Sequence, residues 1–149
     1  MNEQTRLCAS LIEQVKAHHA PAVVLNEGGA VIFGNDAWLS YQKMSGVPAP
    51  YGLGLQYEAV LPISKETAAG RYIRATIDQG VSEVLIGVQP LFCKECDSIT
   101  HSGPIKYRLT VTRCHFADGG CGAIVWGECL SGACASTPPR RRTLRRRAA

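Results

Sequence analysis

The sequence predicts an α+β domain in which helices cover one face of a five-stranded antiparallel sheet, with an amphipathic helix in front. Three observations predict it. The strand-like segments fall into an early pair and a late trio, at 21–25, 30–33, 82–96, 105–115 and 121–129. The chain between the pair and the trio carries helical rather than strand patterns. Strands, helices and again strands within 149 residues form a layered domain with its own core.

Residues 3–19 are the first predicted element, an amphipathic helix. Leu7, Leu11 and Val15 recur at every fourth position, which places them on one face of a helix. Pro21 ends the helix, because a residue that precedes proline is disfavoured in the α conformation. This narrow apolar stripe must cover the domain or pair with a second copy. We expect a homodimer through these three side chains, and assign 1–19 to the helix.

The early strand pair is predicted to be a hairpin that leads into a short helix. Residues 26–29 read NEGG, which is turn chemistry between two apolar runs. Asn35 or Asp36 then caps a helix that runs to Met44, because a side-chain oxygen at this position accepts orphan N–H groups.

A longer helix is predicted from Ser64 to Gln79, after an irregular stretch that contains one helical turn at 56–60. Ser64 is its expected N-cap. Gly80 lies where a helix C-terminal glycine is expected.

The late trio completes the sheet. Tyr107, Leu109 and Val111 alternate with polar residues, the pattern of a half-buried strand. Residues 117–120 read ADGG, a hairpin signal before the last strand.

Positive charge is concentrated at the C-terminal end. The net charge is +4, but six arginines lie between Arg140 and Arg147, and the other 10 Lys and Arg are outnumbered by 12 Asp and Glu. Nucleic-acid binding by the body is therefore not expected, since phosphate neutralisation needs a basic surface. Only the segment Arg140–Arg147 is a candidate for nucleic acid or anionic lipid. We predict that 132–149, rich in Gly, Ser, Ala, Pro and Arg, is disordered.

The predicted location is the cytoplasm. No apolar run approaches the roughly 18 residues of a membrane span. A secretory signal has an apolar core near its N-terminus, a region that here contains the polar residues Glu13, Lys16, His18 and His19. Disulfides are therefore not the default in this reducing compartment, and we expect most of the seven cysteines to be small core or surface residues.

The segment 23–38 reads VVLNEGGAVIFGNDAW: an apolar run, an acidic-Gly turn, a second apolar run, then an Asn that opens a helix. This order resembles the PAS family, with Asn35 at the position of the family's Asn and Asn26 in place of its usual Asp. The stretches GVSEVLIG at 80–87 and GGCGAIV at 119–125 resemble PAS domains of bacterial histidine kinases and cyclic-dinucleotide signalling proteins. The resemblance covers about residues 20–130, and we assign 20–131 to a PAS-like domain.

This resemblance implies a non-catalytic sensory or protein-interaction module of bacterial-type signal transduction. Such a module would regulate a separate signalling protein through dimerisation or a ligand-dependent change. One alternative is a sensor whose apolar pocket holds a small ligand or cofactor. Another is a remnant of a larger sensor kinase or cyclase. The sequence contains no recognisable catalytic triad, phosphate loop or carboxylate pair, so we do not predict an enzyme.

A ligand pocket is most naturally placed between the sheet and the helices, where apolar side chains from both layers meet. Its predicted lining is Val24, Ile32, Trp38, Leu39, Ile73, Ile77 and Leu109.

No bound cofactor is predicted. PAS haem sensors carry a His on the long helix, and residues 65–79 contain none. Light-sensing relatives carry a reactive Cys after the irregular region, and 51–60 has none. Cys93 and Cys96 form a C-x-x-C pair, but positions three apart on a strand point to opposite faces. We therefore expect no metal site at Cys93 and Cys96. The two alternatives are that this pair binds zinc or that it is a thiol switch.

Overall fold

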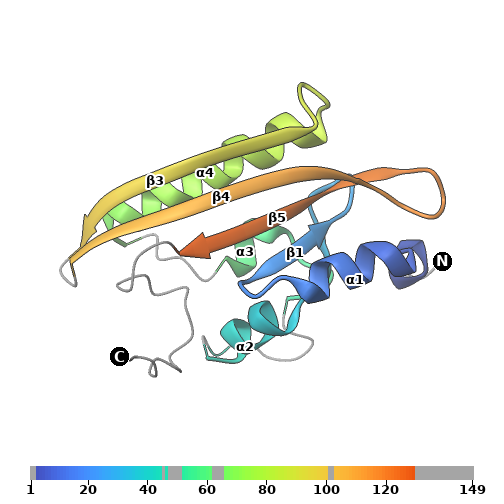
Figure 1. The fold of residues 1–149 in the computed structure, drawn as a ribbon, viewed down its shortest axis with the longest axis horizontal. Helices are drawn as coiled ribbons and strands as arrows, with labels where there is room; N and C mark the ends of the chain where they lie inside the picture. The colour runs from blue at the N-terminus through green and yellow to red at the C-terminus, as the bar shows by residue number, and fades with distance from the viewer. Residues whose placement is uncertain (1–2, 45, 47–51, 62–65, 101–102, 130–149) are drawn as a thin grey trace.

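A five-stranded antiparallel sheet forms the centre of the computed structural model, which describes residues 3–44, 46, 52–61, 66–100 and 103–129 (Figure 1). The strand order is β2-β1-β5-β4-β3. The strands are β1 (Ala22–Leu25), β2 (Val31–Gly34), β3 (Leu91–Thr100), β4 (Gly103–His115) and β5 (Cys121–Cys129). The predicted fold class is confirmed, since helices pack on a five-stranded antiparallel sheet that an N-terminal helix precedes.

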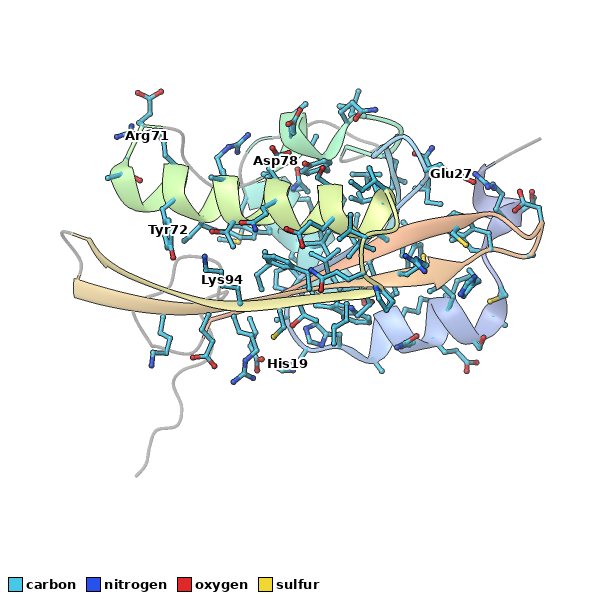
Figure 2. The ribbon with its side chains drawn as sticks, turned by 90° about the horizontal axis from the view of Figure 1, so that it is seen from above. His19, Glu27, Arg71, Tyr72, Asp78 and Lys94 are labelled. Atoms are coloured by element: carbon cyan, nitrogen blue, oxygen red, sulfur yellow. The ribbon has the colours of Figure 1, made fainter. Side chains whose placement is uncertain are left out.

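Four α-helices and one 3-10 turn are present in the described residues. They are η1 (Glu3–Arg6), α1 (Ala9–Ala17), α2 (Asp36–Met44), α3 (Tyr57–Val60) and α4 (Ala68–Leu85). Figure 2 shows α4 on one face of the sheet and α1 on the other. None of the described helices is both long enough and apolar enough to cross a membrane.

Two separate apolar clusters lie on the two faces of the sheet. The larger joins α2, α3 and α4 to one face, and includes Val23, Leu25 and Val31. The smaller joins α1 to the other face, and includes Val24 and Ile32. All four residues of β1 are buried, because successive side chains of a strand point to opposite faces and both faces are covered here.

The N-terminal helix is shorter than predicted. Instead of one helix over 3–19, η1 is followed by a break, and Cys8 adopts an extended conformation as the N-cap of α1. At the other end His18 is extended, with ψ at 135°, three residues before Pro21. The break turns the chain so that Arg6 reaches two loops at the end of the sheet, as described below.

The long helix lies further along the chain than predicted. Thr67 is the N-cap, with its hydroxyl accepting a hydrogen bond from the Gly70 N–H at 2.9 Å. Gly80 is not the terminal glycine, because α4 continues to Leu85 and Gly87, at φ 85°, follows its end. The first part of the strand predicted over 82–96 is therefore helical, and β3 begins only at Leu91.

Close packing explains why a glycine lies inside α4. A Cβ atom at Gly80 would lie 2.6 Å from the Phe92 ring and 3.0 Å from Val111. Gly80 therefore lets α4 approach β3 and β4 closely, and the packing outweighs the low helix propensity of glycine.

The predicted hairpins agree with the structure. The Asn26 side chain accepts hydrogen bonds from the Gly28 and Ala30 N–H groups, both at 3.0 Å, and so closes the β1–β2 turn. The predicted disordered tail, 132–149, lies outside the described residues and stays a prediction.

Candidate functional site

The predicted ligand pocket is divided by the sheet. Trp38, Ile73, Ile77 and Leu109 lie in the larger cluster, with Leu39 packed against it. The remaining two predicted lining residues, Val24 and Ile32, belong to the smaller cluster beneath α1. Their assignment to the pocket was wrong. Val23 and Val31, the adjacent residues on these two strands, face α2, α3 and α4, so Val24 and Ile32 face α1 on the other side of the sheet.

Little space remains inside the larger cluster. A cavity of about 20 Å³ lies between the sheet, α2, α3 and α4, and one water molecule needs roughly 10–15 Å³ of such space. Trp38 and Ile77 line it, together with Val23, Val31, Tyr57, Val60, Leu61 and Val125. The described side chains around this cavity are therefore closely packed, with room for about one water among them.

A buried amide lies beside this core. Gln42 on α2 is fully buried, and its Nε2 donates to the Val60 carbonyl at 2.8 Å. Its Oε1 has no hydrogen-bond partner among the described residues. A buried acceptor without a donor is costly, so this oxygen is a candidate contact for a water or a ligand. No sequence pattern marked Gln42 as a core residue.

Two residues of α4, Arg74 and Asp78, hold α3 against the core. The Tyr57 hydroxyl donates to the Asp78 carboxylate, and burial followed by this hydrogen bond raises the pKa of Tyr57 above its ordinary value. Arg74 donates to the carbonyls of Glu58 at 2.7 Å and Leu61 at 3.4 Å. Both ends of α3 are thereby fixed to α4.

Asn35 has the structural position that the resemblance predicted. It is 2% exposed, and its Oδ1 accepts hydrogen bonds from Ala22 N at 3.1 Å and Trp38 N at 3.0 Å. It is thus the side-chain cap of α2. Its Nδ2 donates to the Ala20 carbonyl at 2.8 Å and the His18 carbonyl at 3.2 Å. One amide therefore joins the end of α1, the start of β1 and the start of α2.

The predicted dimer residues lie inside the chain's own core. Leu7, Leu11 and Val15 are 8%, 6% and 0% exposed and pack against the sheet. The prediction that they pair with a second copy was wrong for this conformation. The stripe covers the domain instead, and a dimer would have to use another surface.

An ion-pair cluster fixes the segment in front of α1. Arg6 donates to Asp118 at 2.6 Å and to Glu27 at 2.8 Å, from the β4–β5 and β1–β2 turns respectively. The guanidinium also lies 4.6 Å from the centre of the Phe116 ring. Hydrogen bonds from Arg6 lower the pKa of both carboxyl groups.

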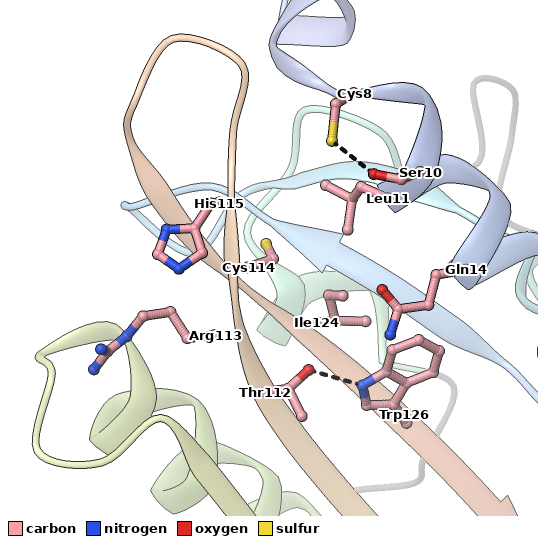
Figure 3. Close-up of a pocket in the computed structure, with 10 residues that line it drawn as sticks. All are labelled: Cys8, Ser10, Leu11, Gln14, Thr112, Arg113, Cys114, His115, Ile124 and Trp126. Carbon is pink, nitrogen blue, oxygen red and sulfur yellow. Dashed lines mark hydrogen bonds between the residues drawn. The ribbon is translucent and has the colours of Figure 1, made fainter.

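A groove of about 500 Å³ opens between α1 and the sheet (Figure 3). Its lining combines apolar and polar side chains with two thiols: Cys8, Ser10, Leu11, Gln14, Thr112, Arg113, Cys114, His115, Ile124 and Trp126. Sequence reasoning missed this groove, because helix–sheet contacts between the two ends of the chain leave no local pattern.

The C-x-x-C pair lies on a regular strand. Cys93 is an exposed free thiol 3.6 Å from the Thr110 hydroxyl, and Cys96 pairs with Tyr107 in the β3–β4 ladder. Among the described residues, no three His, Cys, Asp or Glu side chains gather as a metal site requires.

Comparison with known proteins identifies the fold. No protein-family model and no curated protein matches the sequence. A solved VqmA–ligand–DNA complex from Vibrio cholera superposes with a TM-score of 0.53 and 16% identity, over 83% of this chain and 52% of that one. The Vibrio cholerae VqmA dimer without target DNA gives 0.52 and 16%, over 84% and 52%.

The chain thus spans about half the length of VqmA. The PAS domain of Bordetella pertussis BvgS matches with a TM-score of 0.50 and 16% identity, over 78% of this chain and 79% of that domain. The sheet order, the helix placement and these likenesses agree, and the chain has the fold of a PAS-like domain.

Proposed function

We propose that the chain is a non-catalytic sensory module of the PAS type, which regulates a separate signalling protein through contacts made by its surface. The observation that carries this proposal is the close packing of the described side chains around Trp38 and Ile77, where the cavity between them measures about 20 Å³. An organic cofactor needs hundreds of Å³. A protein contact needs only an outer surface, so the packed core favours signalling through contacts.

Homodimerisation belongs to the same proposal. VqmA, about half of which this chain matches in fold, is a dimer in one of its solved structures. Because Leu7, Leu11 and Val15 are buried within the chain, the contact would involve surface residues of α1 or the exposed part of β3.

Native mass spectrometry of protein purified without added ligand tests this proposal. The expected result is a dimer whose mass equals two chains, and a pull-down would then follow to find the partner. A bare monomer at micromolar concentration would contradict the dimeric module. A chain that carries an additional non-covalent mass would favour the second candidate.

That second candidate is a sensor of a small ligand in the interior, and Gln42 favours it. Its buried Oε1 lacks a donor, which a ligand with an N–H or O–H group would supply. Binding would require α3 to move, since Tyr57 and Val60 close the cavity. We expect Gln42→Leu to lose any bound mass while the dimer persists. An unchanged mass in this variant would exclude Gln42 as a contact.

A further inference from the structure

We propose that the groove between α1 and β4 is a thiol-modification site, in which Cys8 forms a mixed disulfide with a small disulfide-bearing molecule. This proposal goes beyond the proposed function, which requires no covalent chemistry on this face of the sheet.

The groove has the size and lining of a small-molecule site. Its volume of about 500 Å³ lies within the usual range of ligand pockets. Leu11, Ile124 and Trp126 supply apolar contact area, while Ser10 and Gln14 supply polar groups. Figure 3 shows the side chains of Cys8, which immediately precedes α1, and Cys114, on β4, both at this groove.

The position of Cys8 favours the thiolate. It is the N-cap of α1, where the positive end of the helix dipole favours negative charge. Its Sγ lies 3.5 Å from the Ser10 hydroxyl, and this contact lowers the pKa of the thiol. The thiolate is the nucleophilic form of cysteine, and Cys8 is only partly buried.

Two other thiols provide internal comparisons. Cys114 is buried in the smaller cluster, and burial raises its pKa to about 11, so it stays protonated. Cys93 is more exposed than Cys8 but lies outside the groove, beside Thr110. If exposure alone decided reactivity, Cys93 would react first. The groove and the Ser10 contact instead predict Cys8.

The reaction balances without a further oxidant. The Cys8 thiolate attacks one sulfur of the small disulfide, a new S–S bond forms, and the original S–S bond breaks. The second sulfur leaves with the electron pair as a thiolate and takes a proton from solvent. Cys8 is thereby oxidised and half of the small disulfide is reduced. A free small thiol reverses the step.

The adduct would act on the helix that covers the sheet. It would occupy the groove beside Leu11, a residue that holds α1 in the smaller cluster. An adduct in the groove would add contacts to α1 beside Leu11, and that would couple the redox state of small thiols to the surface that the N-terminal helix presents.

The test is the rate of adduct formation at each thiol of the folded, full-length protein. The protein is incubated with oxidised glutathione, and peptide mapping by mass spectrometry follows each cysteine. We expect Cys8 to react at least about threefold faster than Cys93 at pH 7, because the lowered pKa of Cys8 increases its thiolate fraction. The gain is limited, since a thiolate of lower pKa is a weaker nucleophile. In urea-unfolded protein this preference should disappear.

Two variants separate thiol acidity from the groove. Ser10→Ala should move the pH–rate profile of Cys8 to higher pH without removing the thiol. Gln14→Trp should fill the groove, and so slow oxidised glutathione more than methyl methanethiosulfonate, which is small enough to need no groove. Circular dichroism would establish that both variants fold.

Either of two results would overturn the proposal. One is that Cys93 reacts as fast as Cys8 in the folded protein. The other is that Gln14→Trp slows both reagents equally. Because neither measurement depends on stoichiometry or on a partner, failure here would leave the proposed signalling function standing.

Discussion

Asn35 connects three elements by one side chain. Its Oδ1 accepts from the N–H groups of Ala22 and Trp38, and its Nδ2 reaches carbonyls at the end of α1, including that of Ala20. The amide is buried. Its loss would leave several buried backbone groups without partners, and each such group costs about 1–3 kcal/mol.

We therefore expect Asn35→Ala to lower the free energy of unfolding by about 3 kcal/mol, measured by urea denaturation. Asn35→Asp is the matched control. This variant keeps the acceptor but places a carboxylate beside backbone carbonyls. Its free energy of unfolding should therefore increase at acid pH, where the introduced carboxylate is protonated. A loss below about 1 kcal/mol in Asn35→Ala would contradict the role of the network.

Arg6 gives the fold a specific sensitivity to acid. The pKa values of Glu27 and Asp118 are lowered in the folded chain by hydrogen bonds from Arg6. Their contribution is therefore complete above the ordinary carboxyl pKa of about 4 and is lost as the pH falls through the lower folded values. Arg6→Gln should be less stable than the native chain at pH 7, and this difference should shrink towards pH 2.

Urea denaturation at several pH values measures this difference, and added salt should also reduce it, because the carboxylates are largely exposed. A gap that stays constant from pH 7 to pH 2 would show that Arg6 does not stabilise the fold through these two carboxylates.

At the scale of single residues, the sequence predicted Asn35 but not its polar counterpart Gln42. The Asn follows an apolar run and opens a helix, a local pattern that the sequence displays. Gln42 lies on α2 between exposed and half-buried neighbours, and only the contact with Val60 from α3 explains its burial. Such a contact depends on tertiary structure.

At the scale of elements, β5, the strand that follows a clear turn, was easier to predict than the end of the long helix. The bounds of β5 agree with the sequence pattern, because a turn precedes the strand and apolar positions dominate it. The predicted end of α4 is too early, since the helix continues to Leu85 past the expected terminal glycine, Gly80. Its real role is to admit the Phe92 ring, and a sequence alone does not distinguish these two uses of glycine.

The attachment of α3 to α4 leads to a prediction about tyrosine ionisation. Burial and the Asp78 carboxylate raise the pKa of Tyr57, so in an alkaline titration followed by tyrosinate absorbance this residue should ionise after ordinary tyrosines. Asp78→Asn should bring its ionisation to lower pH. The Tyr57→Phe variant identifies the signal, since it should lack the late step.

Hydrogen exchange of α3 provides an independent readout for the same contact. We expect faster exchange in Tyr57→Phe and Asp78→Asn than in the native chain, with β5 unaffected. Two results would show that the hydroxyl–carboxylate contact does not hold α3. One is an alkaline titration of the native chain in which no tyrosine ionises late. The other is a hydrogen-exchange rate of α3 that is unchanged in both variants.

At the scale of the whole molecule, the fold depends on packing on both faces of the sheet. Leu11 is 6% exposed and packs from α1 against the smaller cluster. We expect Leu11→Ala to lower the free energy of unfolding by about 2–4 kcal/mol, as measured by urea denaturation. Glu13→Ala, on the exposed side of α1, is the matched control and should change it little.

Light scattering on the same variants separates folding from assembly. If Leu11 instead formed a dimer contact, Leu11→Ala would dissociate the protein without lowering the stability of each chain. The sequence displayed the apolar stripe correctly, but a stripe of this kind is equally compatible with covering a sheet or pairing with a copy. Only the two-sided burial of β1 decides between them.

The position of β5 bears on how the chain is assembled during synthesis. The β1–β2 and β3–β4 hairpins each join consecutive strands, whereas β5, which follows them in the described part of the chain, lies between β1 and β4. Until β5 leaves the ribosome, both hairpins expose an unpaired inner edge, which is a template for wrong pairing with other chains. Closure of the sheet then awaits contacts between distant parts of the sequence, which form slowly. Among the described strands, the nascent sheet is therefore most exposed to aggregation just before β5 is complete.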